Sequence, residues 1–366
     1  MKKQLPDYML LGVFITLVVF GILFLTGASA IPSQIKAGRP DYFLLRHIFF
    51  GLLPGFFMLA VAYKIPISLL KKSAPYLFVL NLFFIALVFV PGIGVTSGGA
   101  TRWINLYFFS LQPSEFLKIT FVFYLAAWFS NRSSLKKRKE KPVFLPFFLI
   151  ILFISGLFKF QPDISTLGVI IASAMVIYFF SNFPFWHFLL VFFLIIILFT
   201  GFVFLSEYRL ERIMLFLGFL DDPMGIGFQT RQSIITIGSG GVFGQGLGSF
   251  NEKFVFLPQT IGDSIFSVIA QETGFAGSIF LIILFFFFFY RGIKIAEKTR
   301  DEFLSLVVVG LVSWIYIQAF VNIGAMLNLI PITGIPLPFI SYGGSHIIAE
   351  FIAVGLLLNI SKFSER

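Results

Sequence analysis

The chain has 366 residues, of which 58% are hydrophobic and only 12% are charged, and its formal net charge is +10. Its mean hydropathy is +0.96. No soluble domain of this length could bury so much apolar surface, so the bilayer must be part of its solvent. The chain contains no cysteine, which excludes disulfides and thiolate metal sites.

Ten apolar stretches are each near the length that a helix needs to cross the hydrocarbon core. They lie at about residues 8–29, 45–63, 76–91, 113–130, 143–159, 164–181, 185–206, 264–290, 303–327 and 345–361. The first lacks a convincing cleavage site, so we interpret it as a span and not as a removed signal. The predicted fold is an all-α polytopic membrane protein, a single domain over residues 1–366, with about ten transmembrane helices.

The distribution of basic residues predicts the orientation, because cytoplasmic loops carry an excess of Lys and Arg. With the N-terminus inside, 17 of these residues fall on the cytoplasmic side, 9 fall outside and Lys118 falls within a span. We therefore expect a multi-pass protein of the cytoplasmic (inner) membrane with both termini cytoplasmic. The basic run at 136–141 is more typical of a topology signal that contacts anionic lipid than of a nucleic-acid patch, so no nucleic-acid partner is expected.

The longest polar stretch, residues 207–277, interrupts the spans and supplies a long extracellular loop at about 207–263, between spans seven and eight. A long connection with its own pattern inside a compact protein is usually functional. Its glycine run, 238–248, lacks the ending of a P-loop and is interpreted as a close-packed irregular loop. With the outer segments 92–112 and 328–344, it gives three segments, all expected to be non-helical, that can converge over one outward-facing cavity.

Two ionisable residues, Glu115 and Lys118, lie in the fourth span, where a charge normally faces a bundle interior or a watery cavity. Pro113 suits the first turn of a helix, which places Glu115 in that turn and Lys118 on the same face three residues later. A lysine there opposes the helix dipole and needs a partner or an anionic ligand. The pair is therefore either an internal structural contact or a ligand-binding face.

Other polar residues near the outer face also have two interpretations. Arg46 and Arg102 are either interfacial anchors or phosphate ligands. Asp163 is favoured as a helix N-cap, and Glu350 in the last span is as well explained by a buried hydrogen bond as by a functional role. The three histidines give no metal-ligand spacing.

Five motifs in order resemble those of the SEDS family (shape, elongation, division and sporulation), which includes FtsW and RodA. They are GATRWINL with LQPSEFLK (99–118), QPDISTL (161–167), the long segment 220–248, LPQTIGDSIFSVIAQETGFAG (257–277) and PITGIPLPFISYGGS (331–345). The chain departs from the family pattern at several places. Where the family has the string HTD, this chain has Ile261-Gly262-Asp263. Gln259 replaces the Glu of the family's LPE string, and Gln271 replaces the first Glu of its EE pair.

The resemblance implies a peptidoglycan glycosyltransferase that polymerises lipid II, an undecaprenyl-pyrophosphate-linked disaccharide peptide, into β-1,4 glycan strands outside the membrane. The implied partners are a class B penicillin-binding protein transpeptidase and other divisome or elongasome membrane proteins. The implied cellular process is either cell division or cell-wall elongation. A divalent cation such as Mg²⁺ or Mn²⁺ is the one cofactor considered. The implied catalytic residue is Asp263, and the implied substrate-binding residues are Arg46, Arg102, Glu115, Lys118, Glu272, Ser341 and Gly343.

The chemistry of such a substrate agrees with these residue types, since it needs a lipid-accessible groove, cations at the membrane surface and a carboxylate near the sugars. Asp263 comes where the outer loop re-enters the membrane, although an N-cap would also explain an aspartate there. Asp221 and Asp222 compete for the catalytic role, but Asp222-Pro223 is typical of a turn. Two other functions remain open: a transporter that flips lipid-linked precursors, and a non-catalytic scaffold of the division complex.

Overall fold

The computed structural model describes the chain except residues 1–3, 98–99, 107–109, 134–143, 162, 182, 205–206, 221–224, 250–257 and 365–366. The basic run 136–141, Asp221 and Asp222 therefore lie outside the described residues. The first five spanning segments are α1 (Tyr8–Ala37), the continuous run of α2 (Tyr42–His47), the π-helical turn η1 (Ile48–Leu52) and α3 (Leu53–Lys64), then α4 (Ile67–Leu87), α5 (Pro113–Ser133) and α6 (Phe144–Phe160). The other five are α7 (Ile164–Phe180), α8 (Phe185–Phe204), α11 (Ile265–Glu297), α12 (Glu302–Met326) and α13 (Ser345–Ser361).

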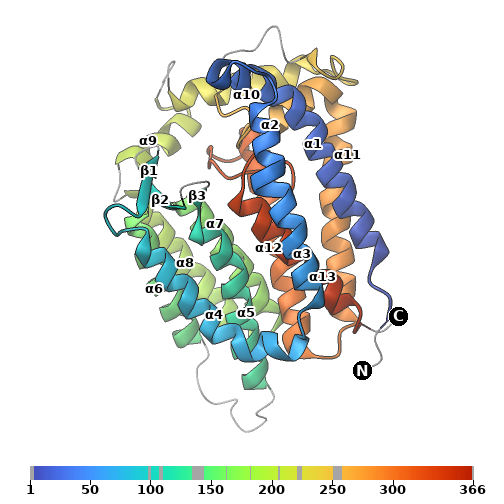
Figure 1. Cartoon of the computed structure of the whole chain (residues 1–366). Helices are drawn as coiled ribbons and strands as arrows, with labels where there is room; N and C mark the ends of the chain where they lie inside the picture. Colours follow the sequence, from blue (N-terminus) through green and yellow to red (C-terminus); the bar gives the residue numbers. More distant parts are fainter. Residues whose placement is uncertain are drawn as a thin grey trace.

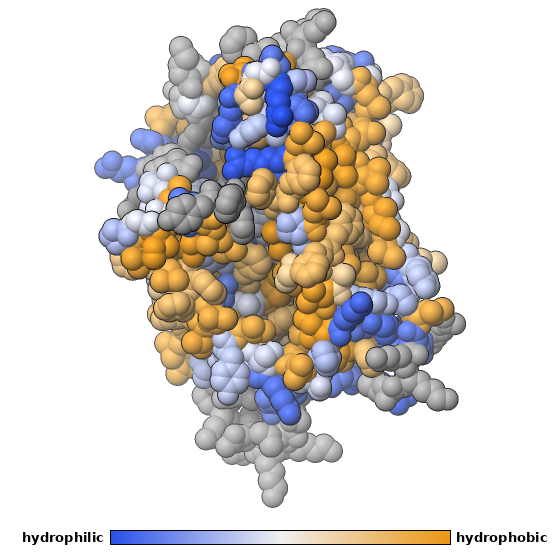
Figure 2. Space-filling view, viewed as in Figure 1, coloured by the Kyte–Doolittle hydropathy of each residue, from blue (hydrophilic) through white to orange (hydrophobic). Residues whose placement is uncertain are grey.

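These ten segments match the ten predicted spans in order. Five of them are long and apolar enough by themselves to cross a membrane, namely α1, the α2–α3 run, α4, α11 and α12. Four shorter segments, in α6, α7, α8 and α13, are also apolar. On the face in view, Figure 2 shows apolar side chains over the middle of the molecule, with hydrophilic residues gathered toward its two ends. The chain is thus a multi-pass membrane protein.

Both termini lie at one end of the molecule, and α9 (Glu207–Phe216) and α10 (Ile226–Ser239) lie at the other (Figure 1). Asp7 ties the terminal end together. Its carboxylate accepts from the backbone of Leu10 at 2.8 Å and pairs with Arg291 of α11, and its backbone N–H donates to Ser361 of α13 at 3.0 Å. Both ends of the chain are therefore on one side, as an even number of spans requires.

The prediction that the long outer stretch is non-helical was wrong for α9 and α10. In α9, Leu210, Ile213 and Met214 recur at helical spacing among charged residues, which is the pattern of a short amphipathic helix. In α10, Gly225 and Gly240 occupy the N-cap and C-cap positions, so these glycines bound a helix and do not interrupt one. A helical period over ten to fourteen residues is easily overlooked beside so many glycines.

The glycine segment (residues 240–248) packs against a break in α11, and its predicted close packing is confirmed. A Cβ added at Gly240 would lie 2.1 Å from the carbonyl oxygen of Ala270, and one at Gly244 would lie 2.2 Å from that of Glu272. The break is at Gly274, where φ is 69° and ψ is −164°. Backbone hydrogen bonds of 2.9–3.1 Å satisfy the groups that the break frees, and they join Gln245 to Gln271, Gly246 to Glu272, Phe275 to Gly241 and Ala276 to Val242.

The outer segment 92–112 forms a small antiparallel sheet that the sequence did not predict. Its strands are β1 (Gly94–Ser97), β2 (Ala100–Asn105) and β3 (Ser110–Leu111), in the order β1-β2-β3. Val95 pairs with Trp103, and Ile104 pairs with Leu111. Val95, Trp103 and Ile104 are β-branched or aromatic residues of high strand propensity, but the segment is too short for its alternation to stand out. The sheet leads directly into α5.

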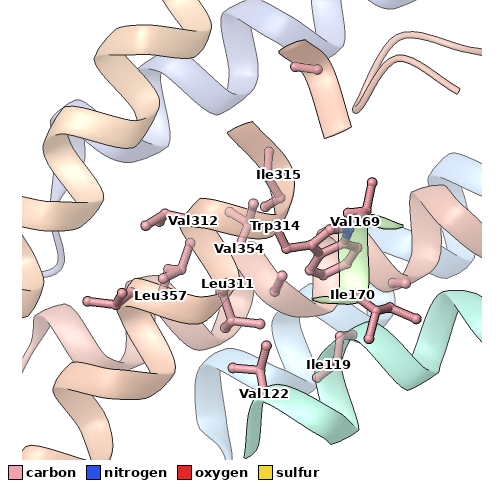
Figure 3. Close-up of a cluster of buried hydrophobic side chains, with 14 of the residues drawn as sticks. Ile119, Val122, Val169, Ile170, Leu311, Val312, Trp314, Ile315, Val354 and Leu357 are labelled. Carbon is pink, nitrogen blue, oxygen red and sulfur yellow. The ribbon is translucent and has the colours of Figure 1, made fainter. Parts of the chain in front are cut away.

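The core of the bundle lies around α12, which packs against α5, α7 and α11. Figure 3 shows Trp314 of α12 among Val169 and Ile170 of α7, with Ile119 of α5 close by. Trp314 is completely buried. A helix that is apolar on all sides is expected at the centre of a membrane bundle, so the few polar side chains of α12 stand out.

Candidate active site at the end of the bundle opposite the termini

Asp263 lies just before α11 and is almost fully buried, with 9% of its surface exposed. Its Oδ2 atom accepts a long hydrogen bond of 3.5 Å from Gln229 of α10, whereas Oδ1 is buried and has no hydrogen-bond partner among the described residues. Burial raises the pKa of the carboxyl from 3.8 to about 6, against smaller opposite effects of backbone hydrogen bonds, of Gln229 and of the positive charge on Arg212. Asp263 is therefore poised to exchange a proton near neutral pH.

The alternative that Asp263 simply caps α11 does not fit the structure. Ser264 occupies the N-cap position, and no side chain caps that helix end. The Gln229 side chain also donates to the Ser264 hydroxyl at 3.1 Å, which joins α10 to the start of α11. The buried carboxylate of Asp263 therefore does not cap the N-terminal end of α11.

The backbone on both sides of Asp263 is fixed by neighbouring elements. Asn322 of α12 donates to the carbonyl of Asp263 at 2.7 Å. The Ser341 hydroxyl donates to the carbonyl of Gly262 at 2.7 Å, and the backbone N–H of Tyr342 donates to that of Ile261 at 2.7 Å. The short segment before α11 is thus held between α12 and the loop at 327–344.

Arg212 of α9 is a residue of this site that the sequence analysis did not single out. Its charge acts on the Asp263 carboxyl, and its Nη1 atom donates to the carbonyl of Ile332 at 2.9 Å. It also lines a cavity of about 570 Å³ between α9, α10 and the loop at 327–344, together with Arg231 and Asn328. Arg212 lies in the polar stretch 207–277, but its contact with Ile332 depends on the helix α9, which the sequence did not predict.

Glu115 and Lys118 form a buried ion pair with a distance of 2.8 Å between Nζ and Oε2. Pro113 starts α5, and Glu115 lies in its first turn, as predicted. Lys118 also donates to Oε1 of Gln318 at 2.7 Å, and its Nζ lies 4.9 Å from the centre of the Trp314 ring. Because Lys118 is only 2% exposed, its contacts in this state are all within the protein, which favours the structural interpretation.

Ser341 and Gly343 face the protein interior in this state. Ser341 is fully buried and accepts from the backbone of Leu337 at 2.8 Å, in addition to its contact with Gly262. The backbone N–H of Gly343 donates to Nδ1 of His47 at 3.3 Å. Both residues therefore make contacts that hold the loop beside Asp263.

Arg46, Arg102 and Glu272 lie on three other elements of the outer end. Arg46 of α2 donates to the Tyr42 hydroxyl at 3.0 Å, and Arg102 of β2 donates to the carbonyl of Gln161 at 3.2 Å. Glu272 accepts from the backbone of Gly248 at 3.1 Å and lines a cavity of about 480 Å³ between α1, α2 and the glycine segment, whose lining does not include Asp263.

The N-cap interpretation of Asp163 is confirmed, and Glu350 is a buried, hydrogen-bonded carboxyl. Asp163 caps α7, accepting from the backbone of Thr166 at 3.3 Å and from its hydroxyl at 2.9 Å. Glu350 is fully buried and accepts from the backbone of Phe339 at 2.8 Å. Within the described part of the chain, no cluster of three or more histidines and carboxylates could hold a metal ion.

Comparison with known proteins places these features in one family. A family model described as a cell cycle protein, FtsW/RodA/SpoVE, matches residues 7–366. The chain is 35% identical to stage V sporulation protein E of Bacillus subtilis over 99% of each chain, and 34% identical to the probable peptidoglycan glycosyltransferase FtsW of Coxiella burnetii over 96% of this chain and 95% of that one.

Solved structures show the same fold. A chain from a peptidoglycan synthase complex that coordinates polymerization and crosslinking superposes with a TM-score of 0.80 at 26% identity, over 97% of both chains. The rod shape determining protein RodA of Thermus thermophilus superposes with a TM-score of 0.72 at 24% identity, over 99% of this chain and 98% of that chain. The chain therefore belongs to the FtsW/RodA/SpoVE family of cell cycle proteins.

Proposed function

We propose that this protein is a peptidoglycan glycosyltransferase that polymerises lipid II into β-1,4 glycan strands on the outer face of the cytoplasmic membrane. The observation that carries the proposal is Asp263, a buried carboxylate with one oxygen that has no hydrogen-bond partner among the described residues. The charge of Arg212, which lines a cavity of about 570 Å³, acts on this carboxyl. Relatives at 34% and 36% identity bear the name of probable peptidoglycan glycosyltransferases, which supports the reaction class.

In the reaction that we propose, a hydroxyl of one lipid II molecule attacks the anomeric carbon of a lipid-linked strand. The new carbon–oxygen bond forms as the bond from the anomeric carbon to the pyrophosphate breaks, and the pyrophosphate leaves with the bonding electrons. Asp263 takes the hydroxyl proton as a general base, which suits a carboxyl whose pKa is about 6. Attack opposite the leaving group converts an α-linked donor into a β-linked product.

The pyrophosphate carries charge that must be stabilised as it leaves. Arg212 is one cation for this role, since its positive charge acts on the Asp263 carboxyl. Arg46 and Arg102 remain proposed phosphate ligands at the outer face. Lys118 could reach the substrate only if its contacts with Glu115 and Gln318 opened.

A divalent cation fits this site only in part. Oδ1 of Asp263 is buried without a hydrogen-bond partner among the described residues, and Mg²⁺ is commonly held by one or two carboxylates together with substrate phosphates. Since no metal-binding cluster exists within the described residues, the substrate pyrophosphate would supply most of the ligands. When bound, such an ion would neutralise charge on the leaving group.

We further propose that the termini are cytoplasmic and that a class B penicillin-binding protein is the partner, in either division or elongation. The charge bias of the loops and the position of α9 and α10 opposite the termini support the orientation. The likeness to a chain of a peptidoglycan synthase complex supports a partner that crosslinks what this protein polymerises.

Purified protein incubated with labelled lipid II, with and without the partner, tests the proposal. Wild type should give ladders of glycan chains, and Asp263→Asn should lower the rate by about 10²–10⁴-fold with protein amount and partner binding unchanged. A transporter would instead move lipid across a vesicle membrane without making polymer, and a scaffold would tolerate Asp263→Asn. Normal ladders from that variant would show that Asp263 is not the general base.

A further inference from the structure

Asn322, near the C-terminal end of α12 (Glu302–Met326), makes two contacts with backbone at the site. It is 1% exposed, and its Nδ2 atom donates to the carbonyl oxygens of Asp263 and Ile335, both at 2.7 Å. A carbonyl oxygen can only accept a hydrogen bond, so the orientation of this amide is fixed by chemistry. Both amide hydrogens are used, and both go to backbone.

The two carbonyls belong to separate parts of the chain. Asp263 ends the segment that re-enters the membrane at α11, and Ile335 lies in the loop at 327–344. Gln318, one turn earlier on α12, repeats the arrangement by donating from Nε2 to the carbonyl of Pro336 at 3.1 Å. Residues four apart share a helix face, so Gln318 and Asn322 donate hydrogen bonds from one face of α12 to two successive residues of the loop. Of these two side chains, only Asn322 also donates to Asp263.

We propose that Asn322 is a positioning residue for the general base, which it holds against the loop at 327–344. The proposal rests on the function proposed above. Gly334 lies directly behind the carboxylate, since a Cβ there would be 3.8 Å from Oδ2 of Asp263. With Asn322 in place, the backbone of Asp263, the loop and Gln229 enclose the carboxyl from three sides. Without its two donors, both buried carbonyls lose a partner and the segment is free to separate from the loop.

The chain contains a matched control for this role. Asn359 of α13 is 4% exposed and donates from Nδ2 to the carbonyls of Ala62 at 3.2 Å and Ile65 at 2.7 Å. It is therefore also a buried asparagine that joins a helix to two backbone carbonyls of another element. Its partners lie at the C-terminal end of α3, toward the end of the molecule that holds the termini. Asn322 and Asn359 should contribute similarly to folding, but only Asn322 touches the site.

The experiment compares Asn322→Ala and Asn359→Ala in the purified full-length protein, with Asn322→Ser and Asn359→Ser as milder variants that keep one donor. Folded monodisperse protein is isolated by gel filtration, and turnover of lipid II is measured across pH 5–8. We expect similar melting temperatures for each matched pair. We also expect turnover to fall by about 100-fold in Asn322→Ala, since a misplacement of about 1 Å can cost that much, and by less than threefold in Asn359→Ala.

The pH profile separates positioning from a loss of folded protein. Burial is the main reason that the pKa of Asp263 is about 6, and the described groups that oppose it are Arg212 of α9 and Gln229 of α10. Loosening the segment admits water, so the acidic limb of the rate profile should move to lower pH in Asn322→Ala and stay near pH 6 in Asn359→Ala. A merely structural asparagine would change neither the limb nor the turnover of the folded fraction.

Several outcomes would overturn the inference. Turnover within threefold of the Asn359 variants, an unmoved limb, or a failure of both Asn322 variants to fold while both Asn359 variants fold would each assign Asn322 to stability alone. If wild type and the Asn359 variants make no polymer from lipid II, the proposed function itself fails.

Discussion

The ion pair between Glu115 and Lys118 gives a prediction that separates its two interpretations. The side chains are 4% and 2% exposed, so neither charge can be hydrated if its partner is removed. Breaking a buried pair by removing one partner typically costs about 3–5 kcal/mol, because the other charge remains uncompensated. Lys118→Met should therefore destabilise the protein by about that amount, and it also leaves Oε1 of Gln318 without its lysine donor.

The double variant Glu115→Gln/Lys118→Met removes both charges and keeps similar volumes, so it should regain most of the lost stability. Unfolding of wild type, Lys118→Met, Glu115→Gln and the double variant in one detergent, followed by tryptophan fluorescence, gives the coupling between the two residues. Polymerisation of lipid II by the double variant then decides the role: activity near wild type means a structural pair, whereas a stable but inactive protein means a ligand role. Unchanged stability of Lys118→Met would refute the buried arrangement itself.

Four further predictions concern Asp263, the glycine segment and the orientation of the chain. The polymerisation rate should rise tenfold per pH unit below about pH 6 and level off above it, because a general base acts only when deprotonated; a flat profile from pH 5 to 7.5 would contradict this. Since burial raises the pKa of the folded acid, its ionisation costs stability as pH rises from 3.8 through about 6, so at pH 7 Asp263→Asn should melt at or above the wild-type temperature. Gly240→Ala should destabilise by about 1–3 kcal/mol, as its Cβ would meet the carbonyl of Ala270, while Gly238→Ala, which has open space around its Cβ, should melt like wild type. Single cysteines at Ser249 and Ser364, in a chain without cysteine, should react with an impermeant thiol reagent in intact cells only at Ser249; the reverse pattern would invert the orientation.

The spans and the position of Asp263 could be predicted from sequence because each depends on local patterns. Long apolar runs are unambiguous, and Asp263 is the carboxylate at the start of one of them. The break in α11 could not be predicted, since Gly274 lies inside an apolar run and its freed backbone groups are satisfied by a segment about thirty residues earlier. Arg212 was missed for the same reason, because its effect on Asp263 exists only after α9 has folded against the loop at 327–344.

Buried charge was also hard to assign from sequence alone. The spacing of Glu115 and Lys118 predicts that they share a helix face, and the structure confirms it. What that face meets depends on α12, whose Gln318 and Trp314 both contact Lys118. The decisive partners are two hundred residues away in sequence, and no local pattern points to them.

The loop at 327–344 shows why a segment without regular structure can frame a catalytic group. Pro331, Pro336 and Pro338 lack backbone N–H groups, so the loop cannot pair its carbonyls in a ladder of its own. Side chains from three helices satisfy those carbonyls instead, and the contacts are Arg212 of α9 to Ile332 at 2.9 Å, Ser165 of α7 to Thr333 at 2.7 Å, Asn322 of α12 to Ile335 at 2.7 Å and Gln318 of α12 to Pro336 at 3.1 Å.

Those side-chain donors make the loop rigid relative to the bundle, and the same donors reach the groups that matter for chemistry. Arg212 donates to the loop and its charge acts on the carboxyl of Asp263. Asn322 donates to both the loop and the backbone of Asp263, and Gln318 contacts both the loop and Lys118. Ser341 completes the frame from the loop's other end through Gly262. A displacement of the loop would therefore disturb the surroundings of Asp263 and Lys118 together, because the same side chains join the loop to both.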